Sequence, residues 1–205
     1  MKRRDYLKSV GSAGLVGFAG CVQSDPGRSP PAESSEPRSV SITASDDIAE
    51  SNEVRIDPTV TEPRLTEEHP PRVTIETTNT GEKRYFASMQ GGLLFNIGWG
   101  GDFSKSPPGL ILLGDKDPPG EYPPEAGTWQ YDPPNVDGPA SGIVIDADET
   151  VTTEYLVLDN PDESGYFSPD EYRFEERIDI QLYRDETPVP GSTANFTWGF
   201  SLQVT

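Results

Sequence analysis

The chain has 205 residues, with 16 Lys or Arg against 35 Asp or Glu, and its formal net charge is −19. This length fits one domain or a domain with a tail, and the charge excludes a nucleic-acid binder that depends on bulk positive charge. A single cysteine excludes an intrachain disulfide scaffold. Ile, Leu, Val and Phe make up about a fifth of the chain, which with this charge lies near the composition of disordered proteins.

Residues 1–20 differ in composition from the rest of the chain. Basic residues open this segment and an apolar stretch follows, which is typical of an export signal. Arg3 and Arg4 resemble the pair of a twin-arginine signal. Residues 18–21 resemble a lipobox, with Phe in place of the more usual Leu or Val. This resemblance implies cleavage before Cys21 and a lipid on Cys21 that anchors the exported protein to the outer face of the cell membrane. The alternative is a buried cysteine that follows a chance arginine pair.

Removal of residues 1–20 makes the chain more acidic. Four basic residues and one acidic residue are lost, which leaves 12 basic and 34 acidic side chains and a net charge of −22. Only three of the remaining basic residues are lysines. This pattern resembles haloarchaeal proteins, whose carboxylates stay hydrated in molar salt while the salt screens their repulsion. The alternative is a disordered acidic protein, but the acids are scattered among aromatic and β-branched residues.

The lipidated Cys21 and residues 22–39 predict a flexible linker, because Pro, Ser, Gly and charged residues dominate and no apolar period is present. Residues 40–205 show repeated alternation of apolar and polar residues, which predicts strands with one face on a core. The apolar positions of the predicted strands are Val40/Ile42/Ala44, Val54/Ile56/Val60, Val73/Ile75/Thr77, Tyr85/Ala87/Met89, Leu93/Phe95/Ile97, Val151/Thr153/Tyr155/Val157, Tyr172/Phe174/Ile178/Ile180/Leu182 and Phe196/Trp198/Phe200/Leu202/Val204. Pro58 predicts an edge position or a kink for its strand, and residues 79–81 predict a turn.

Many short strands with Pro and Gly turns, and no convincing helical stripe, predict an all-β protein with a β-sandwich. The run from Val73 to Gly81 and the Pro169-to-Tyr172 stretch resemble immunoglobulin-like sandwiches of bacterial and archaeal surface proteins. That resemblance implies an immunoglobulin-like fold over about residues 54–205 and a tyrosine corner at Tyr172, whose hydroxyl would bond to upstream backbone. The alternative for Tyr172 is an ordinary core tyrosine.

Residues 98–142 form a long insertion with nine glycines and nine prolines. A long loop in a compact domain is often functional, and aromatic side chains offer large contact areas. We therefore predict a binding surface at the aromatic residues of this range, Trp99, Phe103, Tyr122, Trp129 and Tyr131. The alternative is that the two tryptophans fold back as a small additional core and that residues 110–113 form a strand.

Clusters of acidic residues are candidate calcium sites, because hard cations bind several oxygen ligands. The best group is Asp146, Asp148 and Glu149, and further groups are Asp115 with Asp117 and Asp159 with Asp162 and Glu163. None matches a complete EF-hand loop. The sequence Asn195-Phe196-Thr197 fits a glycosylation sequon, which makes Asn195 a candidate attachment site.

Catalytic motifs are weak in this chain. His69 is the single histidine, and no nucleophile elbow, phosphate loop or dinucleotide fingerprint appears. Zinc and blue-copper sites need more His and Cys than the chain holds. The sequence therefore favours a membrane-anchored binding module with a cell-surface protein or glycan as partner, no nucleic-acid partner and no evident catalysis. The alternatives are an accessory subunit of a membrane complex, a hydrolase that uses carboxylates, and a protease-inhibitor-like domain.

Overall fold

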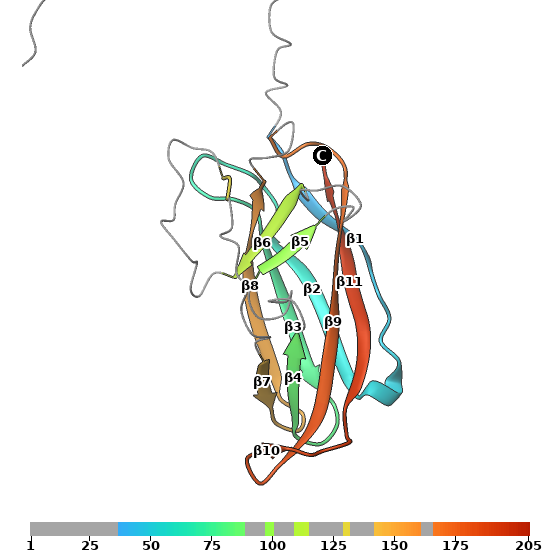
Figure 1. Ribbon diagram of the computed structural model, residues 1–205. Coiled ribbons are helices and arrows are strands. Elements are labelled where there is room, and N and C mark those ends of the chain that lie inside the picture. Colours follow the sequence, from blue (N-terminus) through green and yellow to red (C-terminus); the bar gives the residue numbers. More distant parts are fainter. Residues whose placement is uncertain (1–36, 89–96, 101–108, 115–128, 132–141, 161–165) are drawn as a thin grey trace, which may run out of the picture. The chain divides into compact units, whose positions relative to one another are not determined.

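The structure of the chain is a computed structural model (Figure 1). It describes residues 37–88, 97–100, 109–114, 129–131, 142–160 and 166–205, with the side chains of 88 and 97–100 excepted. The chain divides into two units, Met1–Ser35 and Glu36–Thr205, and all described residues belong to the second unit. No helix among the described residues is long and apolar enough to cross a membrane.

The second unit is built from antiparallel strands and one short 3-10 turn. Its elements are β1 (Val40–Ser45), η1 (Glu50–Asn52), β2 (Val54–Glu62), β3 (Arg72–Asn79), β4 (Arg84–Ser88), β5 (Ile97–Gly100), β6 (Leu110–Gly114), β7 (Gly142–Ile145), β8 (Thr150–Asp159), β9 (Glu171–Arg184), β10 (Thr187–Pro188) and β11 (Ala194–Val204). The prediction of an all-β fold is confirmed.

Two antiparallel sheets pack together as a sandwich (Figure 1). One sheet has the order β7-β4-β9-β11-β1, with β10 as a short hairpin partner of β9. The other has the order β2-β3-β8-β6. β5 pairs with β6 and also meets β9 at Gly100 and Phe174, so that it joins the two sheets. β2 lies at an end of this order, as Pro58 predicts.

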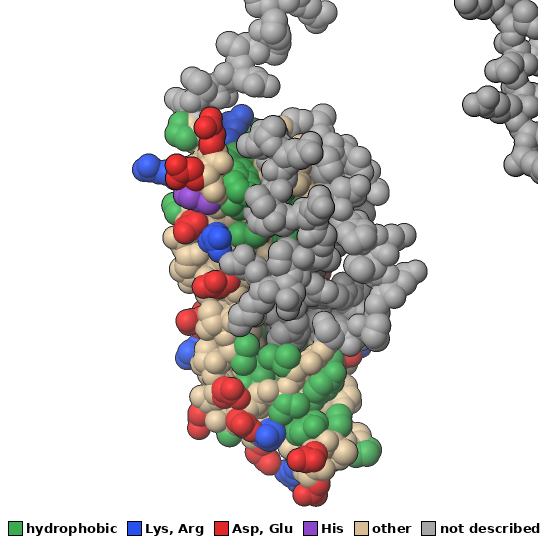
Figure 2. All heavy atoms as spheres, turned by 90° about the vertical axis from the view of Figure 1, so that its left-hand side faces the viewer, with side chains coloured by type: hydrophobic (Ala, Val, Ile, Leu, Met, Phe, Trp, Pro, Cys, Tyr) green, Lys and Arg blue, Asp and Glu red, His purple; other side chains and the backbone are tan. Residues whose placement is uncertain are grey.

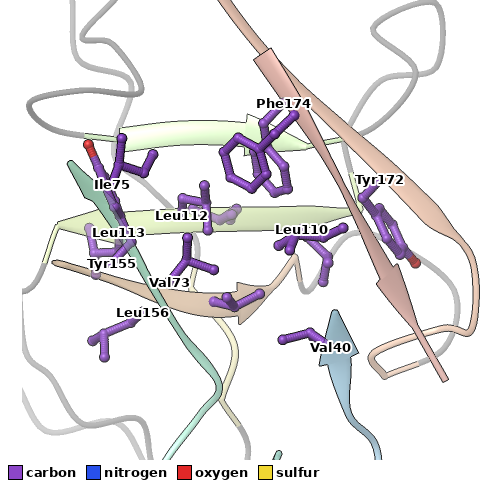
Figure 3. Packing of buried hydrophobic residues seen from close by; sticks show 14 of the residues in the cluster. Val40, Val73, Ile75, Leu110, Leu112, Leu113, Tyr155, Leu156, Tyr172 and Phe174 are labelled. Atoms are coloured by element: carbon purple, nitrogen blue, oxygen red, sulfur yellow. The ribbon is translucent and has the colours of Figure 1, made fainter. Parts of the chain in front are cut away.

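The core lies between the two sheets and is made of side chains that alternate along the strands. On β11, Trp198, Phe200, Leu202 and Val204 are buried, as the alternation predicts. Figure 3 shows residues of β3, β6 and β8 packed near Tyr172 and Phe174 of β9 and Val40 of β1. Burial of these apolar surfaces against each other is the main favourable contribution to folding.

Two strands depart from simple alternation. All residues from Tyr155 to Asn160 are buried, as are Leu110 to Leu113 of β6, so these stretches are covered on both faces. β6 is the strand expected by the alternative interpretation of residues 98–142. Described parts of that range therefore include β5 and β6, together with a bridge at Gln130.

The predicted inward face of β4 is wrong. Phe86 is fully buried, whereas Tyr85 and Ala87 are only half-buried. Phe86 pairs with Ile143 of β7 and Ile180 of β9, and its side chain joins the core. A shift of one residue turns every side chain of a strand to the other face, and two adjacent aromatic residues make both choices plausible in the sequence.

Candidate functional site

The candidate site is built around residues 129–131, one of the described segments of the predicted binding range. This segment runs parallel to the end of β8 and forms a bridge between Gln130 and Asp159. The Asp159 N–H donates to the Trp129 carbonyl at 2.9 Å, and the Tyr131 N–H donates to the Asp159 carbonyl at 3.0 Å. The backbone of the segment is thus fixed on both sides of Gln130.

The Asp159 side chain strengthens this attachment. It is only 2% exposed, and a buried carboxylate is costly unless hydrogen-bond donors surround it. Oδ1 accepts the Phe167 N–H at 2.9 Å, and Oδ2 accepts Nε2 of Gln130 at 3.0 Å. One carboxylate therefore holds two stretches of chain that lie far apart in sequence.

Trp129 connects the segment to a third stretch of chain. Its side chain is 7% exposed, and its Nε1 donates to the Thr66 carbonyl at 2.6 Å. The Trp129 N–H donates to the Tyr166 hydroxyl at 2.7 Å. We refer to Thr66, Trp129, Gln130, Asp159 and Tyr166 with Phe167 as the Asp159 network.

The aromatic pair Tyr166 and Phe167 closes the Asp159 network. Phe167 is buried and has a positive φ of 45°, and its ring meets the Tyr166 ring edge-on with centroids 5.1 Å apart. Burial raises the pKa of the Tyr166 hydroxyl above its ordinary value. The hydrogen bond from Trp129 opposes this shift and the charge of Asp159 adds to it. The Tyr166 side chain remains partly exposed, whereas Trp129, Asp159 and Phe167 of the Asp159 network are buried.

The five aromatic residues of the predicted binding surface do not share one environment in the structure. Trp129 is buried, as in the alternative of a small additional core, and Tyr131 is half-buried against the core. Trp99 lies in β5, opposite Ile111 of β6. Phe103 and Tyr122 lie outside the described residues. A binding role for this aromatic set stays a prediction.

The acidic group at residues 146–149 forms the turn between β7 and β8. Asp146 pairs with Lys83 at 2.7 Å, and this hydrogen bond raises the pKa of Lys83. Oε2 of Glu149 accepts the Asp146 N–H at 2.7 Å, and Asp148 has a positive φ of 59°. Within the described part of the chain, no three His, Cys, Asp or Glu side chains lie close enough together to hold a metal ion. Calcium binding at Asp146, Asp148 and Glu149 stays a prediction.

Asn79 explains the conformation of this turn. Its buried Nδ2 donates to the carbonyls of Glu82, Ile145 and Asp146 at 2.7–3.1 Å, and its Oδ1 accepts the Gly81 N–H. The side chain thereby joins the predicted turn at residues 79–81 to the turn after β7. The acidic residues therefore lie on a turn whose geometry has a structural cause.

The remaining predicted sites are at opposite ends of the chain. Asn195 is exposed near the start of β11, where it pairs with Asp179 of β9. Arg3, Arg4 and Cys21 lie outside the described residues. Export, lipidation and glycosylation stay predictions.

Sequence reasoning missed the central residue of this site. The sequence groups Asp159 with Asp162 and Glu163 as a candidate calcium site, whereas the Asp159 carboxylate is buried and accepts hydrogen bonds from Phe167 and Gln130. A signal was present, because Asp159 directly follows the apolar run Leu156–Leu158. An acid at the end of a fully buried strand must find donors in neighbouring chain.

Comparison with family models, with curated proteins and with solved structures finds no match for this chain.

Proposed function

We propose that the protein is a binding module anchored on the outer face of the cell membrane by a lipid on Cys21. Its sandwich domain presents the range 98–142 to a cell-surface protein or glycan. The observation that carries this proposal is the Asp159 network, which fixes the middle of this range to the sandwich.

The Asp159 network gives the range a rigid base. Binding residues are often found on connecting segments held by a rigid scaffold. Residues 115–128 directly precede Trp129 in the sequence, and residues 132–141 directly follow Tyr131. Each stretch is therefore joined to a residue whose backbone is hydrogen-bonded to Asp159. Attachment at fixed points lowers the conformational entropy that a binding segment loses when it meets its partner.

The proposed fold of the module is immunoglobulin-like. The Tyr172 hydroxyl donates to the Ser168 carbonyl at 2.8 Å, four residues upstream. This is the bond that the resemblance to a tyrosine corner implies. Together with the sandwich of two antiparallel sheets, the bond supports the immunoglobulin-like assignment.

The anchor is tested by replacing the single cysteine. We expect Cys21→Ser to release the protein into the medium or to leave an uncut precursor, since no lipid can then be attached. Fractionation of cells and intact-mass measurement distinguish these results. An unchanged mass and an unchanged membrane fraction would refute the anchor. Co-purification of stoichiometric partners from native membranes would instead favour the accessory-subunit alternative.

The acidic surface is proposed to be an adaptation to high salt. Salt at molar concentration shortens the Debye length to about 3 Å and screens the repulsion among carboxylates. We expect the near-ultraviolet circular dichroism of the protein to disappear when salt is removed by dialysis and to return when potassium chloride is restored. A fully folded protein at low salt would contradict this proposal.

A further inference from the structure

Among the described residues, β7 is an edge strand with one unpaired side. β4 is its single strand partner among the described residues, so the other side of β7 has backbone groups that no described strand pairs. Its sequence, Gly142-Ile143-Val144-Ile145, contains no charge and no proline. Of the features that usually protect such edges, β7 has a short length of four residues, but no charged side chain and no proline.

β2, an edge strand of the other sheet, shows such protection. β2 carries Pro58 and an exposed ion pair between Arg55 and Asp57, whose atoms are 2.7 Å apart. The hairpin strand β10 has two residues, one of which is Pro188. β7 has neither an ion pair nor a proline, so its free side is a candidate for pairing with another chain.

The side chains of β7 also favour a partner. Val144 is 36% exposed and is one of two large hydrophobic residues that are exposed among the described residues. Tyr85, its partner on β4, lies against Gly142, where a Cβ atom would meet the Tyr85 hydroxyl. Figure 2 shows hydrophobic side chains gathered on this side of the domain, above a lower end that carries both acidic and basic side chains.

The charge at one end of β7 determines what kind of chain fits. Directly after Ile145, the turn carries Asp146, Asp148 and Glu149, all of them exposed. Lys83 pairs with Asp146, whereas Asp148 and Glu149 make no ion pair with the described residues. The edge is thus apolar along its length and negative at its C-terminal end.

We propose that β7 binds an extended segment of another protein, which adds to the sheet as an antiparallel strand beside Gly142–Ile145. Antiparallel pairing is the more stable arrangement per residue, and it places the N-terminal end of the segment next to residues 146–149. The segment therefore has Lys or Arg first and alternating β-branched residues after them. A second copy of β7 fits less well, because residues 132–141 before it contain two Asp and no Lys or Arg.

The test uses the full chain, labelled with nitrogen-15, and synthetic peptides in which valine and threonine alternate. One peptide has two lysines before the alternating run, one has the lysines after it, and one has glutamates before it. We expect the first peptide to shift the amide resonances of residues 142–145 and to slow their hydrogen exchange. The second peptide should bind more weakly, and the glutamate peptide should not bind at matched ionic strength.

Two variants locate the site. Val144→Lys adds a charge and removes the exposed apolar side chain, and we expect it to weaken the first peptide about tenfold. Thr59→Lys adds the same charge to an exposed position of β2 and should leave binding unchanged. Equal loss in both variants would overturn the proposal.

Three further results would also overturn it. One is that no peptide shifts residues 142–145, and another is that the glutamate peptide binds as well as the lysine peptide. The third is that the amides of this range that point away from β4 are already protected without peptide. Protection that rises with protein concentration would identify a second copy as the occupant, and protection at all concentrations would identify another part of the same chain.

Discussion

The buried carboxylate of Asp159 accepts a hydrogen bond from the main-chain N–H of Phe167 at 2.9 Å. Phe167 has a positive φ of 45°, which is uncommon for a large residue and needs support from its surroundings. The hydrogen bond supplies such support at the end of residues 161–165. The same carboxylate also holds Gln130, so that one side chain fixes the chain at both places.

Replacement of Asp159 by alanine should strongly destabilise the domain. The Asp159→Ala variant leaves the Phe167 N–H and the Gln130 amide without their acceptor, and we expect a loss of about 3 kcal/mol in the free energy of unfolding. Urea unfolding at constant salt measures this loss. Glu154→Ala on the exposed face of the same strand is the control and should change stability little. Equal stability of both variants would show that the carboxylate is not essential.

The Tyr172 hydroxyl should contribute more to stability than a similar exposed hydroxyl. Tyr172 is largely buried and donates to Ser168, and we expect Tyr172→Phe to cost about 1 kcal/mol. Tyr183 makes a comparable bond to the Glu186 carbonyl at 2.7 Å, but in an exposed turn. Tyr183→Phe should therefore cost clearly less in the same unfolding assay. The reverse order would argue against a tyrosine corner.

The domain should lose stability at alkaline pH. Burial raises the pKa of Tyr155 well above its ordinary value of 10.0, and that of Tyr166 is raised from the same value. Above pH 10, the unfolded chain loses these protons first, so it binds fewer protons than the folded chain and the free energy of unfolding falls as pH rises. Lys83, whose pKa is raised by Asp146, acts in the same direction.

Phenylalanine variants separate these contributions. We expect Tyr155→Phe to make the alkaline loss of stability shallower, and Tyr166→Phe to do so to a smaller extent because its side chain is partly exposed. Urea unfolding on both sides of the tyrosine pKa gives the slope. An unchanged slope in the Tyr155→Phe variant would contradict the assignment.

Quenching of tryptophan fluorescence by acrylamide should test whether Trp99 is exposed. Trp198 is fully buried and Trp129 is 7% exposed, so acrylamide should hardly reach either of them. If Trp99 belongs to an exposed binding surface, part of the emission should be quenched, and Trp99→Phe should remove that part. Emission that acrylamide does not quench in the unmodified protein would argue against a binding surface at Trp99.

The sequence predicted the strands whose alternation is strict, and it failed where a strand is covered on both faces. β9 and β11 bury the predicted side chains Phe174, Ile178, Trp198 and Phe200. On β4, Tyr85 and Phe86 are adjacent aromatic residues, and a period of two does not distinguish which one faces inward. Only the pairing of β4 between β7 and β9 decides it.

The candidate site was less predictable than the strands. Composition identified residues 98–142, but not that Trp129 would bury its ring and donate to Thr66. Asp159 looked like one acid among many because the chain has 35 acidic residues. Its role depends on contacts with Gln130 and Phe167, and no local pattern encodes such distant contacts.

The range 98–142 is proposed to contact a partner from a base held by Asp159. The most direct measurement places a photo-crosslinking benzophenone amino acid at Tyr122 of the full chain in its native cells, with Thr59 of β2 as the control position. We expect a discrete adduct from position 122, none from position 59, and loss of the adduct when Asp159→Ala is added. Absence of an adduct at position 122, or equal adducts at both positions, would contradict the account.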